Sequence, residues 1–105
     1  MALVKKKVAL PINYTSDIAA KIQQRRLQLL VHSFLYYDRN VNLISDMQWD
    51  NWAKELVQLQ KDYPQIADKV IYSDAFKNFD GSSGFDLPYS DERIVKIGMW
   101  LLLIN

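Results

Sequence analysis

Apolar residues recur at helical spacing through the first half of the chain. One stripe repeats at i, i+3, i+4 and i+7 and consists of Leu27, Leu30, Val31 and Phe34. This period is typical of one face of an amphipathic helix, so we expect the stripe in the core. Thr15 or Ser16 is a suitable N-cap. The pattern therefore predicts a helix from Asp17 to about Tyr37.

A second helix is predicted after a polar link. Ser45 and Gln48 have the spacing of a capping box, in which two side chains satisfy amides at the helix start. The core stripe of this helix comprises Trp52, Ala53, Leu56 and Leu59. The pair Tyr63-Pro64 ends the helix, because proline disfavours helical geometry in the residue before it.

The second half of the chain alternates short apolar patterns with turn residues. Two short helices are predicted, one over 65–71 and one around Phe76 and Phe79. Residues 80–89 are rich in glycine and serine and predict a loop. Residues 90–105 predict a final helix that is apolar on most sides, so it is either buried centrally or forms a partner or dimer face.

The first 13 residues have a different pattern. Apolar residues flank Lys5 to Lys7, and Pro11 follows. This pattern predicts a short edge strand or an extended arm over 1–13. The fold class is therefore mainly α, a single helical domain over 1–105 with three to five helices and a short N-terminal strand or arm.

Composition narrows the functional classes. The chain has 105 residues, of which 50% are hydrophobic, which fits one domain with one modest core. The formal net charge of +1 disfavours strong phosphate-driven nucleic-acid binding. Without cysteine, and with a single histidine, thiolate and His-based metal clusters are excluded. Neither a signal peptide nor a membrane span is recognised, so we expect a cytoplasmic protein without membrane contact.

Aromatic and acidic residues cluster around the link between the first two helices. Tyr36 and Tyr37 close the first helix, and Asp46, Trp49 and Asp50 share one face of the second because their spacing is i, i+3, i+4. An aromatic plate flanked by carboxylates suits a flat, positively charged ring that carries sugar hydroxyls. Alternatively, the carboxylates stabilise the helix N-terminus, and Tyr36 packs against the following helix.

The same stretch resembles a known protein family. The strings LYY at 35–37, D-x-x-W-D at 46–50 and KELVQLQKDYP at 54–64 are similar to the small N-terminal helical domain, called Ia, of bacterial NAD-dependent DNA ligases. The similarity runs without a gap from about Leu27 to Pro64. It implies that the chain binds NAD through its nicotinamide mononucleotide (NMN) half.

The resemblance also implies which residues contact the nucleotide. The family's contacting positions fall on Tyr36, Tyr37, Asp46, Trp49 and Asp50. Tyr37 stands where many members have histidine and Trp49 where they have tyrosine, and Asn42 replaces a proline that usually stiffens the link. Free-standing copies of this domain look like bacteriophage proteins, so the resemblance implies a stand-alone, phage-encoded module.

Catalysis is not supported by the sequence. Ligases of that family accept AMP on the lysine of a K-x-D-G motif, whereas Asn78 precedes Asp80-Gly81 at the lysine position. The amides of this Gly/Ser loop suit either an anion nest or a plain turn. His32 has no catalytic partner at a recognisable spacing and is assigned a structural or peripheral role.

The sequence therefore predicts a non-catalytic module that binds NAD or NMN and no metal. The rival hypothesis is a protein-interaction module, such as a phage inhibitor of a host defence or replication protein. That module would use the aromatic and acidic face or the terminal apolar helix. The terminal helix also suits a homodimer through Trp100 and Leu101.

Overall fold

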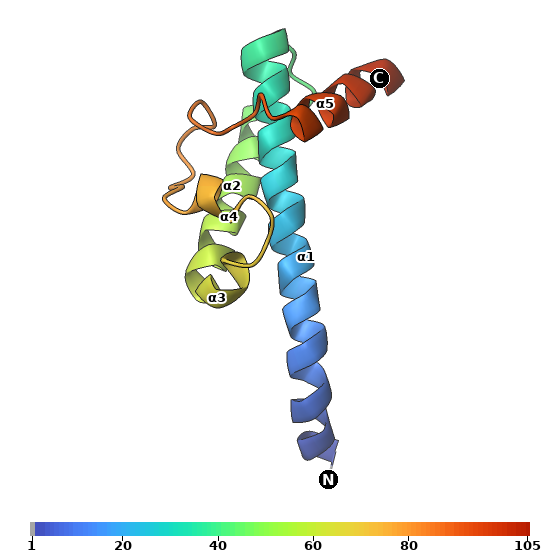
Figure 1. Ribbon diagram of the computed structural model, residues 1–105, viewed down its shortest axis with the longest axis vertical. Helices are drawn as coiled ribbons and strands as arrows, with labels where there is room; N and C mark the ends of the chain where they lie inside the picture. The colour runs from blue at the N-terminus through green and yellow to red at the C-terminus, as the bar shows by residue number, and fades with distance from the viewer. Residues whose placement is uncertain (1) are drawn as a thin grey trace.

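The computed structural model describes residues 2–105, with side chains described from residue 16 onward. Within this range the chain forms five helices and no strand, so the mainly α prediction is confirmed. The helices are α1 (Ala2–Arg39), α2 (Asp46–Asp62), α3 (Pro64–Ala67), α4 (Ser73–Phe76) and α5 (Glu92–Ile104). Helix α1 is the long axis of the molecule, and the other helices pack around its C-terminal half (Figure 1).

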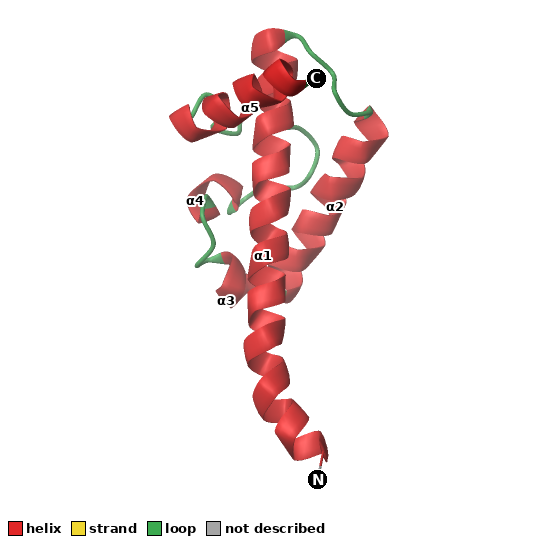
Figure 2. Ribbon diagram, turned by 90° about the vertical axis from the view of Figure 1, so that its right-hand side faces the viewer, coloured by secondary structure: helices red, strands yellow, loops and turns green. Residues whose placement is uncertain are grey.

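The prediction of an extended arm over 1–13 is wrong for the described residues. Helix α1 is continuous from Ala2, so Pro11 lies inside it and the helix start expected at Asp17 does not exist. Alanine, leucine and lysine, which dominate this segment, are strong helix formers. A proline inside a helix removes one backbone hydrogen bond and bends the helix. Figure 2 shows such a bend in the N-terminal part of α1.

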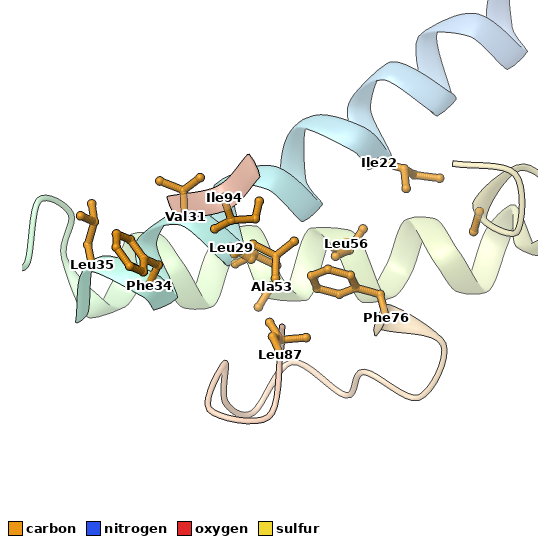
Figure 3. Packing of buried hydrophobic residues seen from close by; sticks show 12 residues of the cluster. Ile22, Leu29, Val31, Phe34, Leu35, Ala53, Leu56, Phe76, Leu87 and Ile94 are labelled. Atoms are coloured by element: carbon orange, nitrogen blue, oxygen red, sulfur yellow. The ribbon is translucent and has the colours of Figure 1, made fainter. Parts of the chain in front are cut away.

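The core forms where α1 lies between α2 and α5. Buried apolar side chains come from every helix and from the loop before α5 (Figure 3), and they are Ile22, Leu29, Leu30, Val31, Phe34, Leu35, Ala53, Leu56, Ala67, Phe76, Leu87 and Ile94. Most of the stripe predicted on α1 is confirmed as core, while Leu27 is only partly buried. Leu29, on the other side of α1, is buried as well, because neighbours cover more than one face of this helix.

A buried arginine on α1, Arg26, forms hydrogen bonds to α2 and to the segment between α3 and α4. Arg26 is 1% exposed, and its guanidinium donates to the Gln60 side chain at 2.8 and 3.1 Å. It also donates to the carbonyls of Val70 and Ile71 at 3.0 and 3.2 Å. Gln60 in turn donates to the Phe76 carbonyl at 3.1 Å. These bonds fix the segment between α3 and α4 against α1 and α2.

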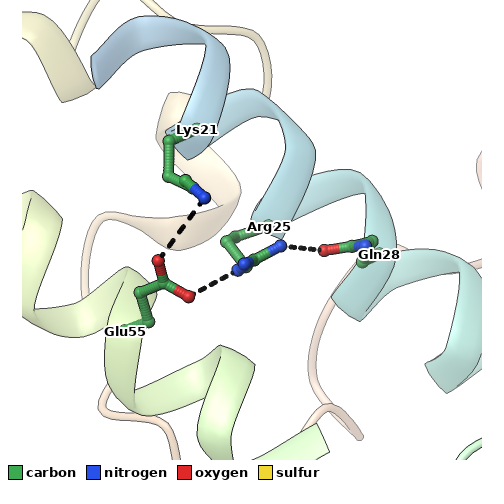
Figure 4. Close-up of polar contacts among 4 residues, drawn as sticks. All are labelled: Lys21, Arg25, Gln28 and Glu55. Atoms are coloured by element: carbon green, nitrogen blue, oxygen red, sulfur yellow. Dashed lines mark hydrogen bonds and ion pairs between the residues drawn. The ribbon is translucent and has the colours of Figure 1, made fainter. Parts of the chain in front are cut away.

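A second polar cluster joins α1 to α2 closer to the surface. Glu55 accepts from Arg25 Nε at 2.7 Å and lies 3.9 Å from Lys21 Nζ, and Arg25 also donates to Gln28 at 2.7 Å (Figure 4). Partly exposed ion pairs of this kind contribute about 0–1 kcal/mol each. Their main effect is to fix the relative position of the two helices that also form the candidate site.

Only one face of helix α5 packs against α1, in the C-terminal half of α1. Ile94 and Gly98 are buried, and a Cβ built on Gly98 would lie 2.5 Å from the Phe34 ring, so the two helices are in close contact. On the opposite face Trp100, Leu103 and Ile104 are 58%, 84% and 56% exposed. Central burial of this helix, one of the two alternatives read from the sequence, is therefore wrong, because α5 lies on the outside of α1. None of the described helices is both long and apolar enough to cross a membrane.

Candidate functional site

One pocket of about 220 Å³ opens beside the link between α1 and α2, the link that is drawn at the top of Figure 2. Its walls come from the end of α1, the link, the first turns of α2 and the Gly/Ser loop. The lining residues are His32, Ser33, Tyr36, Tyr37, Val41, Asn42, Leu43, Ile44, Ser45, Asp46, Trp49, Asp50, Ser82, Ser83 and Gly84. All the site residues predicted from the sequence therefore surround the same pocket.

Two helix caps set the directions from which these side chains enter the pocket. Helix α1 ends at Arg39, and the next residue, Asn40, has a left-handed φ of 56°. The amide of Val41 donates to the Leu35 carbonyl at 2.9 Å. A left-handed residue directly after the last turn is a common way for a helix to end. At the start of α2 the Ser45 side chain accepts from the Gln48 amide at 3.0 Å, which confirms the Ser45 half of the predicted capping box. Within the described structure the Gln48 side chain makes no reciprocal bond to the Ser45 amide.

The two tyrosines differ in how firmly they are held. Their rings meet edge to face at 4.9 Å, and Tyr36 is 48% exposed. Tyr37 stacks on Tyr89 at 5.5 Å and meets the ring of Phe85 at 5.3 Å. Its hydroxyl lies 3.3 Å from the Ser83 side chain. Tyr37 is therefore fixed in the pocket wall, whereas Tyr36 presents an open aromatic surface.

The acidic residues of the pocket have no protein partner. Asp46 and Asp50 are exposed, and neither carboxylate has a hydrogen bond or ion pair within the described part of the chain. Among the described residues, no lysine or arginine lines the pocket. Asp46 lies in the first turn of α2, where the helix dipole favours a negative charge. The dipole accounts for Asp46 in part, but Asp50 lies a full turn further along the helix.

The aromatic side of the pocket is completed by Trp49 and His32. Trp49 is half-buried and meets the Phe79 ring edge to face at 6.3 Å. His32 lies against Trp52 with 5.7 Å between ring centroids, and burial lowers its pKa below the ordinary value of 6.5. The imidazole is therefore neutral at pH 7 and adds no positive charge to the pocket.

Several lining residues were not predicted as site residues. Ser33 is 2% exposed, and its hydroxyl has no hydrogen-bond partner within the described structure. Gly84 lies directly over it, since a Cβ on Gly84 would come 2.1 Å from Ser33 Oγ and 3.0 Å from the Trp49 ring. Ser33 does share the i, i+3, i+4 face of Tyr36 and Tyr37, and this spacing is the signal that could have found it.

The Gly/Ser loop has an internal structure of its own. Asp80 accepts from the amide and the hydroxyl of Ser82 at 2.9 and 2.7 Å, and these hydrogen bonds lower the pKa of the Asp80 carboxyl. Gly81 has a φ of 85°, which favours glycine at this turn. The described residues contain no group of three or more acidic, histidine or cysteine side chains that could hold a metal ion.

Comparison with known proteins assigns this part of the chain. Residues 15–69 match the model of a family described as "DNA ligase-like, N-terminal NAD+-binding domain". The chain belongs to this family. The matched region contains the end of α1, the link, α2 and α3, and thus every site residue that the sequence predicted.

Individual DNA ligases are similar to this chain over about half of its length. The DNA ligase of Bacteroides fragilis is 37% identical over 67 residues, which are 59% of this chain and 10% of the ligase. The DNA ligase of Endomicrobium trichonymphae is 43% identical over 51 residues, 49% of this chain and 8% of that protein. The chain thus spans about a tenth of the length of its curated relatives. No solved structure matches it significantly.

Proposed function

We propose that the chain binds NAD through its NMN half in the pocket between α1, α2 and the Gly/Ser loop. The observation that carries this proposal is the pair of unpartnered carboxylates, Asp46 and Asp50, beside aromatic rings in one pocket. These residues fall within the region that matches an NAD+-binding family. The volume of about 220 Å³ is below the roughly 300–1,000 Å³ of pockets for drug-sized ligands, so the pocket can enclose only part of a dinucleotide.

Each predicted side chain has a role in this proposal. Tyr36 and Trp49 contact the faces of the nicotinamide ring, and the ring's positive charge is attracted to their π-systems. Asp46 and Asp50 accept hydrogen bonds from the ribose hydroxyls, and their negative charge opposes that of the ring. Tyr37 forms the wall that holds the ligand against the other residues.

The proposed activity is binding without catalysis by this chain. Asn78 occupies the lysine position of the K-x-D-G motif, so the residue that accepts AMP in ligases is missing from this sequence. Nucleotide held here is therefore sequestered or handed to a separate adenylating protein. No metal is needed for this role.

The proposal is tested by calorimetric titration with NMN, NAD and AMP. We expect heat with NMN and NAD but not with AMP, because the pocket recognises the nicotinamide half. Asp50→Asn removes one carboxylate without changing the size of the side chain and should weaken NMN binding. Asp17→Asn is the matched control, because Asp17 is exposed on α1 far from the pocket. No heat with any ligand at millimolar concentration would refute the proposal.

A second candidate function is protein interaction through α5. The specific observation is the exposed apolar face formed by Trp100, Leu103 and Ile104. A homodimer through this face would be detected by sedimentation velocity over a range of micromolar concentrations, and Trp100→Ser should abolish it. If the wild-type chain sediments as a monomer at every concentration, the homodimer is refuted. The exposed face of α5 would then have to bind a different protein.

A further inference from the structure

Negative charge is concentrated in the two segments that surround the pocket. Residues 36–50 and 80–89, which lie beside the C-terminal half of α1 (Figure 1), contain five aspartates and one arginine, a net charge of −4 in a chain whose total is +1. The aspartates are all exposed, and they are Asp38, Asp46, Asp50, Asp80 and Asp86. Arg39 is already paired, with its Nε 3.4 Å from Asp38 and its guanidinium over the Phe34 ring. This end of the molecule therefore attracts a cationic partner.

Inside the pocket such a partner meets two carboxylates and aromatic rings. Asp46 and Asp50 share one face of α2, and neither has a hydrogen bond or ion pair within the described part of the chain. Trp49 lies on the same face of the helix, and the half-exposed Tyr36 also lines the pocket. A guanidinium suits this combination, because its flat face stacks on aromatic rings and its N–H groups donate to carboxylates.

The rim of the pocket is apolar and exposed. Leu43, Met47 and Phe85 are 37%, 72% and 62% exposed. Leu43 lines the pocket, Met47 directly follows Asp46, and Phe85 packs against Tyr37. In the described part of the chain, every large apolar side chain that is exposed lies either around this pocket or on α5. A small cation would leave the rim in water, whereas a protein segment with apolar residues would cover it.

We propose that this face docks a segment of a partner protein in which an arginine is flanked by apolar residues. The arginine side chain enters the pocket, and its guanidinium binds Asp46 and Asp50. The apolar neighbours of the arginine cover Leu43, Met47 and Phe85 at the rim. This inference goes beyond the proposed function, because the partner is a protein, but both ligands occupy one pocket. Nucleotide and partner therefore exclude each other.

The first test uses the wild-type chain and three blocked tripeptides, Leu-Arg-Leu, Leu-citrulline-Leu and Leu-Glu-Leu. NMR titration of isotope-labelled protein gives both the affinity and the site. We expect the arginine peptide to shift the amides of residues 46–50 and the indole N–H of Trp49, and the glutamate peptide to shift neither. Citrulline keeps the shape of arginine without its charge, so its peptide should bind roughly 5- to 20-fold more weakly. Added salt should weaken the arginine peptide most.

The second test separates the rim from the pocket. Met47→Ser should weaken the arginine tripeptide roughly 2- to 5-fold, and it should not change the binding of blocked arginine, which has no apolar neighbours. Leu103→Ser is the matched control, because Leu103 is also an exposed apolar side chain but lies on α5. Asp50→Asn should weaken both ligands, and Asp17→Asn should weaken neither.

The outcomes distinguish this inference from the proposed function. If the arginine and citrulline tripeptides bind equally, if the shifts fall on α5, or if no tripeptide binds at millimolar concentration, this inference is overturned, whatever NMN does. If the arginine tripeptide binds in the pocket and NMN does not bind, the inference stands and the proposed function falls. If both ligands bind without competing, the inference is overturned, because it requires them to share the pocket.

Discussion

The hydroxyl of Tyr37 lies 3.3 Å from Oγ of Ser83, which joins the end of α1 to a loop 46 residues further along the chain. Ser83 Oγ also accepts from the Phe85 amide at 3.1 Å, and the Phe85 ring packs against Tyr37. The loop is therefore held on the pocket by one of the residues predicted to contact the ligand. Substitution of Tyr37 would change both the wall and the ligand contacts, so other positions separate the two effects better.

Gly84→Ala is the sharpest probe of how the loop closes the pocket. The added Cβ would lie 2.1 Å from Ser33 Oγ and 3.0 Å from the Trp49 ring, so the loop or both neighbours must move. Overpacking of this kind costs about 1–3 kcal/mol. We expect a lower urea midpoint together with weaker NMN binding, measured by denaturation and by calorimetry.

The matched test for Gly84→Ala is the double variant with Ser33→Ala. Removal of Oγ eliminates the closest contact, while the Ser33 Cβ at 3.1 Å and the Trp49 ring at 3.0 Å remain. The double variant should therefore recover part of the stability that Gly84→Ala loses. Additive losses in the two single variants would contradict the contact between Gly84 and Ser33.

Local spacing accounts for the part of the site that was predicted. Tyr36 and Tyr37 are adjacent in sequence, and Asp46, Trp49 and Asp50 lie within one helical turn and a half. A capped helix start and a helix end bring these two groups together over a short link. Each of these features is visible in the sequence, so the resemblance and the spacing pointed to the same pocket.

The rest of the site depends on contacts between distant segments. Ser83 and Gly84 reach the pocket because residues 80–89 fold back over α1 and α2. The local sequence of a loop does not predict which part of the tertiary structure the loop packs against. The arm predicted over 1–13 is wrong for the described residues, because the helix formers around Pro11 outweigh the helix-breaking tendency of a single proline. The exposed face of α5 was ambiguous, since an apolar helix has the same sequence whether it is buried or meets a partner.

Arg26→Met should destabilise the chain more than any substitution of the surface ion pairs. The guanidinium of Arg26 is the only donor shown to Gln60 Oε1 and to the carbonyls of Val70 and Ile71 in the described structure. Its loss leaves these part-buried acceptors without their protein donor, which costs about 1–3 kcal/mol. Urea denaturation measures the free energy of unfolding.

The control for Arg26 is its neighbour. Arg25→Met removes a contact to Glu55, which is partly exposed, and should cost only about 1 kcal/mol. Arg26→Lys tests geometry, because one ammonium group does not replace the fork of a guanidinium that reaches three acceptor groups. An Arg26→Lys variant as stable as the wild type would show that charge alone suffices at this position.

Tyr72 gives the chain a predicted sensitivity to alkaline pH. Burial and the hydrogen bond from its hydroxyl to Asp91, 2.7 Å long, raise the pKa of Tyr72 to about 12 from an ordinary value of 10.0. The stabilisation from the neutral phenol is complete below pH 10 and is lost as the pH rises toward 12. Ultraviolet titration should show one tyrosine that ionises at a higher pH than an ordinary tyrosine does. The Asp91→Asn substitution should bring the pKa of Tyr72 closer to 10.0. An unchanged titration in Asp91→Asn would remove Asp91 as a cause.

Protonation of His32 should make the stability of the chain depend on pH in the acid range. Burial lowers the pKa of His32 below 6.5, so the unfolded chain takes up a proton at a higher pH than the native chain does. Stability conferred by the neutral imidazole is therefore present above pH 6.5 and is lost as the pH falls through the lowered pKa. A His32→Gln variant should show a flatter decline of the free energy of unfolding in that window. NMR titration of the carbon-bound imidazole protons gives the pKa directly.

A bound pyridinium cation near His32 should lower this pKa further, because two positive charges in one pocket repel each other. A pKa above 6.5 in the free protein, or one that rises when NMN is added, would contradict a neutral histidine beside a cationic ring.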